Sequence, residues 1–207
     1  LGRLTTETLL LDGKYKQQIY SCTYDNLGRL STRCQSSSKN CQIQYTYNVR
    51  RQMTSLQCPL FHENVYYNQP RDESSDPCYN GDISSIQYGY RSAIQSPSEM
   101  TSYDYHYDSM DRIVQSDYIG YKNDKGTYDT SYLYDKQGNI VYLSRNNIEP
   151  ESSEIQMADD VQLTYQGNQL KSYKDNGFDV SSRDILLPGH GGASAQYSYD
   201  NRGNMTA

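Results

Sequence analysis

A seven-residue motif recurs along this 207-residue chain and limits the folds that it can adopt. Its fullest copy is YDNRGNM at residues 199–205, in which glycine follows an aspartate three positions later. Intact or altered copies are YDNLGRL at 24–30, YNVRRQM at 47–53, YDSMDRI at 107–113 and YDKQGNI at 134–140. Since each copy is short and follows a segment of alternating residues, the motif predicts a turn between two strands.

The motif has the composition of a hairpin loop. Aspartate at the first position of a type I turn, with glycine three residues later, is typical of a three-residue loop closed by a G1 bulge. The carboxylate can accept backbone N–H bonds, and the glycine supplies a positive φ. The resulting register places Tyr24 opposite Leu30, a pair worth roughly 0.2–1 kcal/mol. The expected turns are 25–28, 48–51, 108–111, 135–138, 167–168 and 200–203.

The shorter variant YQGNQL at residues 165–170 keeps this pairing. A two-residue Gly-Asn loop is a recognised hairpin turn, and it leaves Tyr165 opposite Leu170. The repeat therefore preserves the tyrosine–aliphatic pair rather than the loop length. The candidate structural residues of the turns and pairs are Tyr24, Asp25, Gly28, Tyr47, Tyr107, Asp108, Tyr134, Asp135, Gly138, Tyr165, Gly167, Tyr199, Asp200 and Gly203.

Two copies lack the glycine, and one segment diverges further. Arg51 and Asp111 stand at the glycine position, and arginine tolerates the left-handed conformation poorly, so we expect a different turn at 48–51. Tyr79 precedes Asn80-Gly81, the strongest two-residue hairpin signal, and we count it as a divergent copy of the motif. The sequence thus predicts one hairpin per copy in a loose repeat.

Residues that alternate along each strand predict one aromatic or aliphatic face. Tyr20, Cys22 and Tyr24 share a face by the period of two, and the other copies repeat this pattern. Connections are predicted at Ser92–Ser98, Asn146–Ser153 and Ser181–Gly192. Met157–Asp160 is a candidate helical turn, and nothing favours a long helix.

The composition is unusual for a globular domain. The chain has 23 tyrosines, two phenylalanines and no tryptophan, and its mean hydropathy is −0.93. Such a low value is typical of disorder, but tyrosine combines large rings and β propensity with a nearly polar score. We therefore predict an all-β fold with tyrosine packing. The net charge of −6 argues against nucleic acid as a partner, and no apolar run is long enough to span a membrane.

The cysteines and histidines do not form a recognisable site. Five cysteines lie in the first 78 residues, at spacings that match no zinc template. We expect Cys22 to be a buried thiol, and we leave open a disulfide between Cys34 and Cys41. His62, His106 and His190 are scattered, and we expect His106 to be solvated on a polar strand face. The motif aspartates serve turns, so we predict no catalytic, cofactor-binding or metal-binding residue.

The motifs resemble the YD repeats of the Rhs family, which includes the shell component of Tc toxins and the teneurin ectodomain. The segment from Cys58 to Ser85 is similar to Rhs proteins of Bacteroidetes. The resemblance implies antiparallel hairpins wound into a spiral sheet, as part of a hollow shell around a C-terminal toxin or effector. It implies one array over residues 1–207, truncated at both ends, because Gly2-Arg3-Leu4 repeats Gly28-Arg29-Leu30.

The resemblance also predicts partners and a location. The partners are other YD repeats of the full-length chain and the enclosed C-terminal polypeptide, and the location is secreted or at the cell surface. The family's autoproteolytic segment has no match here. The alternative function is an extracellular module for adhesion, in which exposed tyrosines bind glycans or a protein. Core packing is the favoured role of the tyrosines, since they follow the strand period and the turn frame.

Overall fold

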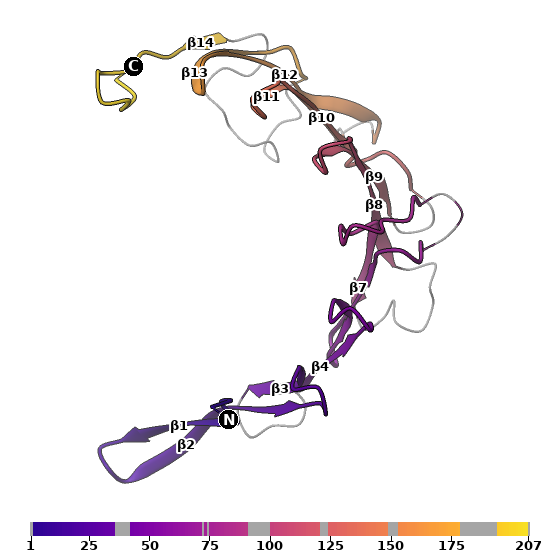
Figure 1. The fold of residues 1–207 in the computed structure, drawn as a ribbon, viewed down its shortest axis with the longest axis vertical. Coiled ribbons are helices and arrows are strands. Elements are labelled where there is room, and N and C mark those ends of the chain that lie inside the picture. Colours follow the sequence, from indigo (N-terminus) through magenta and orange to yellow (C-terminus); the bar gives the residue numbers. More distant parts are fainter. Residues whose placement is uncertain are drawn as a thin grey trace. The chain divides into compact units, whose positions relative to one another are not determined.

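The computed structural model describes residues 2–35, 42–71, 73, 75–90, 100–120, 124–148, 153–178 and 194–206. These residues form fourteen strands and no helix (Figure 1). The predicted all-β fold of antiparallel hairpins is confirmed. Within the described residues, no helix is long and apolar enough to cross a membrane. The chain divides into two compact units, residues 1–102 and 103–207.

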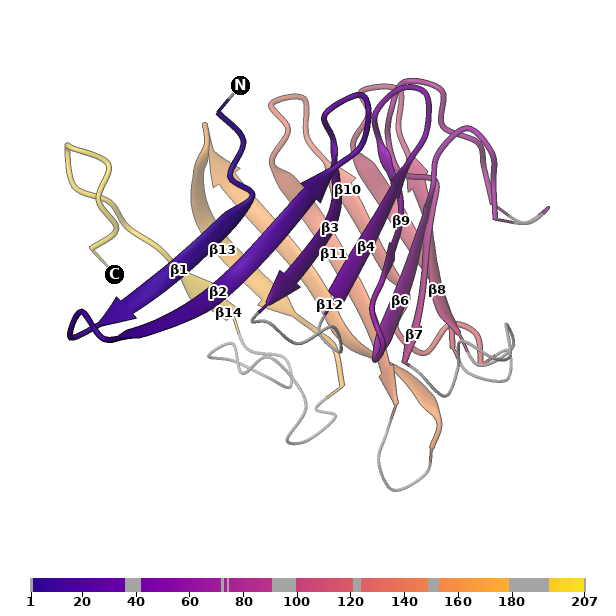
Figure 2. The ribbon, with the colours of Figure 1, turned by 90° about the horizontal axis from the view of Figure 1, so that it is seen from below.

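The first unit contains seven antiparallel strands in chain order. They are β1 (Thr6–Leu11), β2 (Tyr15–Tyr24), β3 (Leu30–Gln35), β4 (Gln42–Tyr47), β5 (Met53–Gln57), β6 (Phe61–Tyr66) and β7 (Ser85–Tyr90). A tight turn joins β1 to β2, in which Asp12 and Gly13 both have positive φ, 48° and 66°. The motif turns after β2 and β4 lie on the same side of the sheet, at the ends of the strands (Figure 2).

The second unit begins within β8 and is also built of antiparallel hairpins. Its strands are β8 (Thr101–Tyr107), β9 (Ile113–Ile119), β10 (Thr130–Tyr134), β11 (Ile140–Ile148), β12 (Ile155–Gln166), β13 (Gln169–Asp175) and β14 (Ser194–Gln196). The turns of the hairpins β8–β9 and β10–β11 lie at the same end of the strands of this unit (Figure 2). The motif turns therefore form a row within each unit.

The register agrees with the sequence prediction in both units. Tyr24 lies opposite Leu30, Tyr47 opposite Met53 and Tyr134 opposite Ile140, each directly after a bulge. The short hairpin pairs Tyr165 with Leu170, and Tyr199 forms an isolated bridge with Met205. A one-residue slip would move every tyrosine to the opposite face, so these pairs fix which face is aromatic.

The prediction for Tyr79 was wrong. The Asn80-Gly81 pair does not join two strands, because the connection from β6 to β7 runs over residues 67–84. Tyr79 is 66% exposed within this connection, while Ser84 donates its backbone N–H to the carbonyl of Tyr66. Gly81 has a φ of 115°, and the Asn80 side chain accepts the Asp82 N–H, so the local turn signal produces a bend inside a long loop.

A predicted helical turn and a predicted loop also need correction. Met157–Asp160 is not a helical turn but lies inside β12, where Met157 pairs with Asn146 and Asp159 with Arg145. Strand β11 continues to Ile148, so the predicted loop at 146–153 begins three residues too early. Tertiary pairing overrides the weak local preference at both places. The loops predicted at 92–98 and 181–192 lie outside the described residues.

Few side chains are fully buried. The buried apolar side chains among the described residues are Cys22, Val65, Ala158, Val161 and Tyr173. The thiol of Cys22 is free and buried, as the sequence predicts, whereas Cys41 lies outside the described residues. Because this core is small, cross-strand pairs and contacts between neighbouring turns must carry much of the stability.

Two substitutions at the same turn position should change stability in opposite directions. Gly138 has a φ of 91° and no atom near the place of a Cβ, whereas Arg51 has a φ of 68°. Gly138→Val should lower the free energy of unfolding by more than about 1 kcal/mol, because a β-branched residue is strained there. Arg51→Gly should raise it by about 0.5–1 kcal/mol.

Denaturant melts would measure both effects. Gly138→Asn is the control, since asparagine tolerates the left-handed region better than valine. A neutral Gly138→Val substitution would reject the assigned turn.

The isolated chain should self-associate through β1. Among the described residues this strand pairs only with β2, and Leu9, Leu10 and Leu11 are 42%, 60% and 51% exposed. An exposed apolar edge is a template for pairing with another chain. We expect the mass measured by light scattering to rise with concentration and Leu10→Lys to reduce this rise. Leu133→Lys is the matched control, because Leu133 is 59% exposed on β10, which pairs with both β9 and β11. A monomer at all concentrations would contradict this expectation.

Candidate functional site

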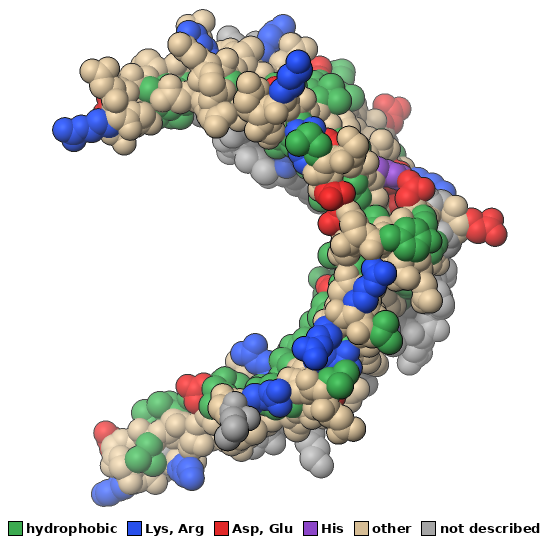
Figure 3. All heavy atoms as spheres, in the orientation of Figure 1, with side chains coloured by type: hydrophobic (Ala, Val, Ile, Leu, Met, Phe, Trp, Pro, Cys, Tyr) green, Lys and Arg blue, Asp and Glu red, His purple; other side chains and the backbone are tan. Residues whose placement is uncertain are grey.

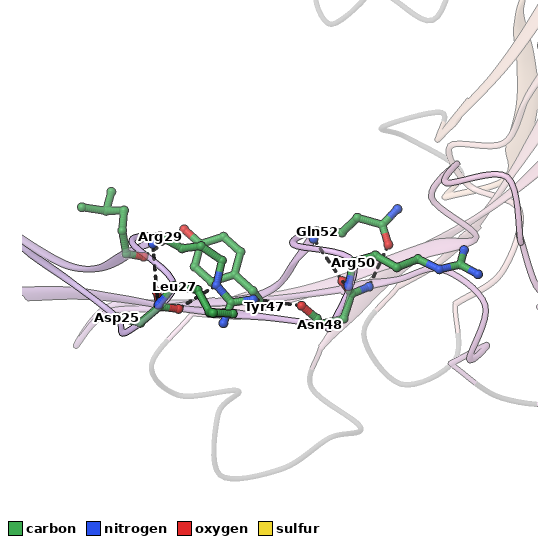
Figure 4. Close-up of polar contacts among 8 residues, drawn as sticks. Asp25, Leu27, Arg29, Tyr47, Asn48, Arg50 and Gln52 are labelled. Carbon is green, nitrogen blue, oxygen red and sulfur yellow. Dashed lines mark hydrogen bonds and ion pairs between the residues drawn. The ribbon is translucent and has the colours of Figure 1, made fainter. Parts of the chain in front are cut away.

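The first complete motif turn shows how the aspartate organises the loop (Figure 4). Asp25 Oδ1 accepts the backbone N–H groups of Leu27 at 2.9 Å and Arg29 at 2.8 Å. The backbone N–H of Gly28 donates to the Asp25 carbonyl, and that of Asp25 to the Arg29 carbonyl, both at 2.9 Å. The Arg29 side chain donates from Nε to Asp25 Oδ2 at 2.6 Å. One carboxylate therefore satisfies the turn backbone and also holds the arginine.

The other motif aspartates occupy equivalent places. Asp108, Asp135 and Asp200 each accept two backbone N–H groups, from the residues two and four positions later, at 2.8–3.1 Å. The fifth residue after the tyrosine is a further partner: Arg112 in one turn, Asn139 and Asn204 in the others. The glycines Gly28, Gly138, Gly167 and Gly203 all have positive φ.

The turn at 48–51 keeps the same geometry without aspartate or glycine. Asn48 Oδ1 accepts the N–H groups of Arg50 at 2.9 Å and Gln52 at 3.0 Å. The Arg51 N–H donates to the Asn48 carbonyl, as glycine does elsewhere. The expectation of a different turn was therefore wrong: Arg51 adopts the left-handed conformation, and Asp111 does so with a φ of 59°.

Hydrogen bonds stabilise the charged form of each turn aspartate. The Arg29 backbone N–H is the largest cause of the lowered pKa of Asp25. The side chain of Arg112 has the same effect on the pKa of Asp108, as do Asn139 on Asp135 and Asn204 on Asp200. Acidic and basic side chains lie interspersed on the face shown in Figure 3. The aspartates of the first and third motif turns are paired with arginines, whereas Asp135 and Asp200 are held by neutral asparagines.

The motif tyrosines join each hairpin to the one before it. The Tyr47 hydroxyl donates to the Leu30 carbonyl at 2.9 Å, and Tyr134 donates to Ile113 at 2.7 Å. Tyr199 donates in the same way to Leu170, at 2.9 Å. In each case the acceptor is the aliphatic residue that pairs with the preceding tyrosine or holds its position in the motif. We call this set of hydroxyl–carbonyl bonds the tyrosine ladder.

The ladder includes residues that sequence reasoning placed differently. Tyr67 donates to the Met53 carbonyl at 3.0 Å, so Tyr67, and not Tyr79, continues the repeat after β5. Tyr24 donates to the Leu4 carbonyl at 2.9 Å, and the Arg3 guanidinium lies 5.5 Å from its ring centre. Gly2 has a φ of 81°, in the same region as the turn glycines. Residues 2–4 therefore make the contacts that the glycine and the two residues after it make in a motif turn.

A second set of contacts comes from the residue after the turn glycine position. Arg29 donates from Nη1 to the Asn48 carbonyl, and Arg112 to the Asp135 carbonyl. Gln52 and Asn139 reach the carbonyls of Gly81 and Gly167. The guanidinium groups of Arg29 and Arg112 also lie 4.9 and 4.5 Å from the ring centres of Tyr47 and Tyr134. In these four cases a side chain at one turn therefore contacts the backbone of the following turn or loop within the same unit.

Sequence reasoning missed a row of hydroxyl pairs. The residue before a motif tyrosine is a threonine or serine in four copies, and it pairs across the hairpin. These pairs are Thr23–Thr32, Thr46–Thr54, Thr164–Ser172 and Ser198–Thr206, with oxygen separations of 2.6–3.1 Å. The hydroxyl residue directly before these four tyrosines was the available signal. It marks the polar side of the hairpin, opposite the tyrosine in the strand alternation.

Other candidate groups have structural partners. His106 Nε2 lies 2.9 Å from Asp117 Oδ2, so the histidine is half-buried against a carboxylate and not simply solvated. Asp159 is buried, and Arg145 Nε donates to it at 2.6 Å. Within the described residues, no group of three or more His, Cys, Asp or Glu side chains could hold a metal ion. His190 lies outside those residues.

Two further motif tyrosines that the sequence predicted lie on strands: Tyr107 is the last residue of β8, and Tyr165 lies on β12 opposite Leu170.

Comparison with known proteins shows a likeness in fold only. No family model and no curated protein match the chain. The crystal structure of TcdB2-TccC3-TEV matches 98% of it, with a TM-score of 0.67 and 14% identity. That of TcdB2-TccC3 without its hypervariable C-terminal region matches 96%, with a TM-score of 0.51 and 12% identity. The chain spans only 10% and 11% of those chains. The match supports an Rhs-like YD-repeat fold.

Removing one ladder hydroxyl should destabilise the chain measurably. Tyr47→Phe keeps the ring but leaves the Leu30 carbonyl without its donor, so the free energy of unfolding should fall by about 1 kcal/mol. Tyr79→Phe is the control, because Tyr79 is 66% exposed, and it should have almost no effect. Equal effects of the two substitutions in urea melts would show that the ladder bond contributes nothing specific.

The turn aspartates should make the fold sensitive to acid. Their pKa values are lowered in the folded state, so their stabilisation is present above the ordinary aspartate pKa and is lost as pH falls through the lowered pKa. The four substitutions Asp25→Asn, Asp108→Asn, Asp135→Asn and Asp200→Asn should remove this part of the acid sensitivity. Asn48 shows that an amide supports the same turn.

Urea midpoints at about pH 7 and about pH 2.5 would measure this effect. The quadruple variant should differ from the wild type mainly at the higher pH. Other carboxylates titrate in both proteins, so their effects cancel in the difference. A difference that stays the same at both pH values would contradict the role of the carboxylates.

Proposed function

We propose that this chain is a structural segment of an Rhs-type shell, which encloses a C-terminal toxin or effector polypeptide and catalyses no reaction of its own. The tyrosine ladder is the observation that carries this proposal. It joins hairpin to hairpin by the same contact, although the sequence separation between donor and acceptor varies from 14 to 29 residues. Such a contact extends a wall by repetition.

The hydrogen bonds that the motif residues make support a structural role. Asp25, Asp108, Asp135 and Asp200 bind turn backbone, and the tyrosines bind carbonyl groups of the preceding hairpins. These groups are occupied by the architecture and are not gathered around a common reaction centre. A wall requires such an extended arrangement, whereas an enzyme requires convergent groups.

The fold likeness supports the enclosed partner. One of the similar structures is described as lacking a hypervariable C-terminal region, so the TcdB2-TccC3 chain has such a region. By analogy, the partners of this chain are other YD repeats and a C-terminal polypeptide within the shell. The segment at 58–85 favours a shell of the Bacteroidetes type. Secretion or display at the cell surface follows from the same analogy.

The adhesion alternative has less support from the motif tyrosines. Binding by stacking requires a row of exposed rings, but Tyr24, Tyr47, Tyr134 and Tyr199 are half-buried and donate to carbonyl groups. Burial also raises the pKa of Tyr47 and Tyr134. These contacts favour packing over a continuous binding surface.

Limited proteolysis of the full-length protein tests the proposal. The downstream polypeptide should survive longer with this segment intact than with it deleted, because a closed wall excludes the protease. Equal digestion rates would reject encapsulation.

A milder variant separates the wall from the rest of the protein. Combining Tyr47→Phe, Tyr134→Phe and Tyr199→Phe removes three ladder bonds and should accelerate digestion of the enclosed polypeptide. Tyr79→Phe, the matched control, should leave the digestion rate unchanged. The same rate in both variants would indicate that the ladder does not seal the wall.

A further inference from the structure

A cavity lies beside the turn at 48–51 in the first unit. Its volume is about 280 Å3, close to the lower end of the roughly 300–1,000 Å3 of small-molecule sites. Asn48 and Thr54 line it from the β4–β5 hairpin. The opposite lining is the consecutive run of residues 64–69, from the end of β6 into the following loop. The cavity therefore lies between the β4–β5 hairpin and the end of β6 with the loop that follows it.

Several side chains of the cavity are fixed by the fold. Asn48 bonds to the turn backbone and to Gln52, and the Thr54 hydroxyl bonds to that of Thr46. Tyr66 donates to Gln87 Oε1 at 3.3 Å, and Tyr67 donates to the Met53 carbonyl at 3.0 Å. These bonds hold the walls and the two tyrosine rings in place without a ligand.

Other side chains of the lining retain their hydrogen-bonding capacity. The amides of Asn64, Asn68 and Gln69 have no partner among the residues that the structure describes. Each amide offers two donor hydrogens and one acceptor oxygen. Amides without a partner in the described part of the chain and two tyrosine side chains thus line the same cavity.

The charge of the lining restricts the ligand. Its residues include no Asp, Glu, Lys, Arg or His. An ionised ligand would lose its hydration without gaining a charged partner, which is unfavourable. A neutral molecule with many hydroxyl groups and an apolar C–H face matches the amides and the rings. These are the properties of a sugar residue.

The strand pairing disfavours an extended peptide. Strand β6 pairs with β5 on one side and with β7 on the other, so its backbone offers no free edge. Peptides that bind to sheets commonly add a strand to such an edge. Here the side chains alone would hold the ligand, as they do for a carbohydrate.

We propose that this cavity binds one ring of a neutral oligosaccharide, held by Asn64, Asn68 and Gln69 beside the rings of Tyr66 and Tyr67. The binding is independent of the proposed shell function, because the site lies within one hairpin pair. A second cavity of about 280 Å3, lined by Gln166, Gln169, Tyr197 and Tyr199 in the other unit, has a similar amide and tyrosine lining. It also contains Lys171, so the first cavity fits a neutral ligand better.

Saturation-transfer NMR with maltotetraose, cellotetraose and chitotetraose tests the proposal. At least one tetraose should receive saturation and bind with a Kd of about 1 mM, as few contacts permit. Asn68→Ala combined with Gln69→Ala should weaken that binding about five-fold or more. Gln137→Ala removes an exposed amide elsewhere, at the β10–β11 turn, and should leave the affinity unchanged.

Asn64→Ala gives a second, independent variant of the cavity, and far-UV circular dichroism verifies that each variant folds. It should weaken binding as well. No transfer to any tetraose would overturn the proposal, and so would undiminished binding by a folded cavity variant. Binding of an uncharged Asn-Ser-Gly peptide without binding of any tetraose would assign the cavity to polypeptide instead.

Discussion

When one hairpin packs beside another, backbone carbonyl groups at the turn lose water and need a donor from the protein. The tyrosine hydroxyl supplies that donor in each unit, for example from Tyr47 to Leu30 and from Tyr134 to Ile113. Phenylalanine offers a similar ring but no donor. This requirement gives a physical reason for tyrosine rather than phenylalanine at the five ladder positions. The same side chain packs against its cross-strand partner and satisfies the neighbouring turn.

The local part of this arrangement could be predicted from the sequence. Aspartate and glycine in the motif specify the loop, and the loop fixes the register that pairs Tyr24 with Leu30. The contacts between hairpins could not be predicted, because every residue has a backbone carbonyl and the acceptor has no distinct sequence signal. Tyr79 illustrates the limit: the adjacent Asn-Gly favoured it, but Tyr67 makes the ladder bond. A strong local turn signal therefore does not identify the repeat.

Two further differences show long-range pairing acting against local preference. Met157–Asp160 forms part of a strand because Asp159 meets Arg145 on β11, where a helical turn would leave the buried carboxylate without this partner. Arg51 accepts a left-handed conformation that costs roughly 1–2 kcal/mol. The turn bonds of Asn48, the pair of Tyr47 with Met53 and the Gln52 contact to Gly81 together offset that cost. Local strain is tolerated because Arg29 of the preceding turn and the loop around Gly81 fix the turn on both sides.

The contact between hairpins does not depend on the connection that joins them. Donor and acceptor are 14 residues apart for Tyr67 and Met53 and 29 apart for Tyr199 and Leu170, yet the distances are 3.0 and 2.9 Å. Loop closure entropy changes slowly with length, so such variation has a modest thermodynamic cost. The connections between hairpins can therefore lengthen while the row of turns stays unchanged. An architecture of this kind is extended by adding hairpins that make the same contact with the hairpin before them. It does not require a large closed core, which agrees with the few fully buried apolar side chains among the described residues.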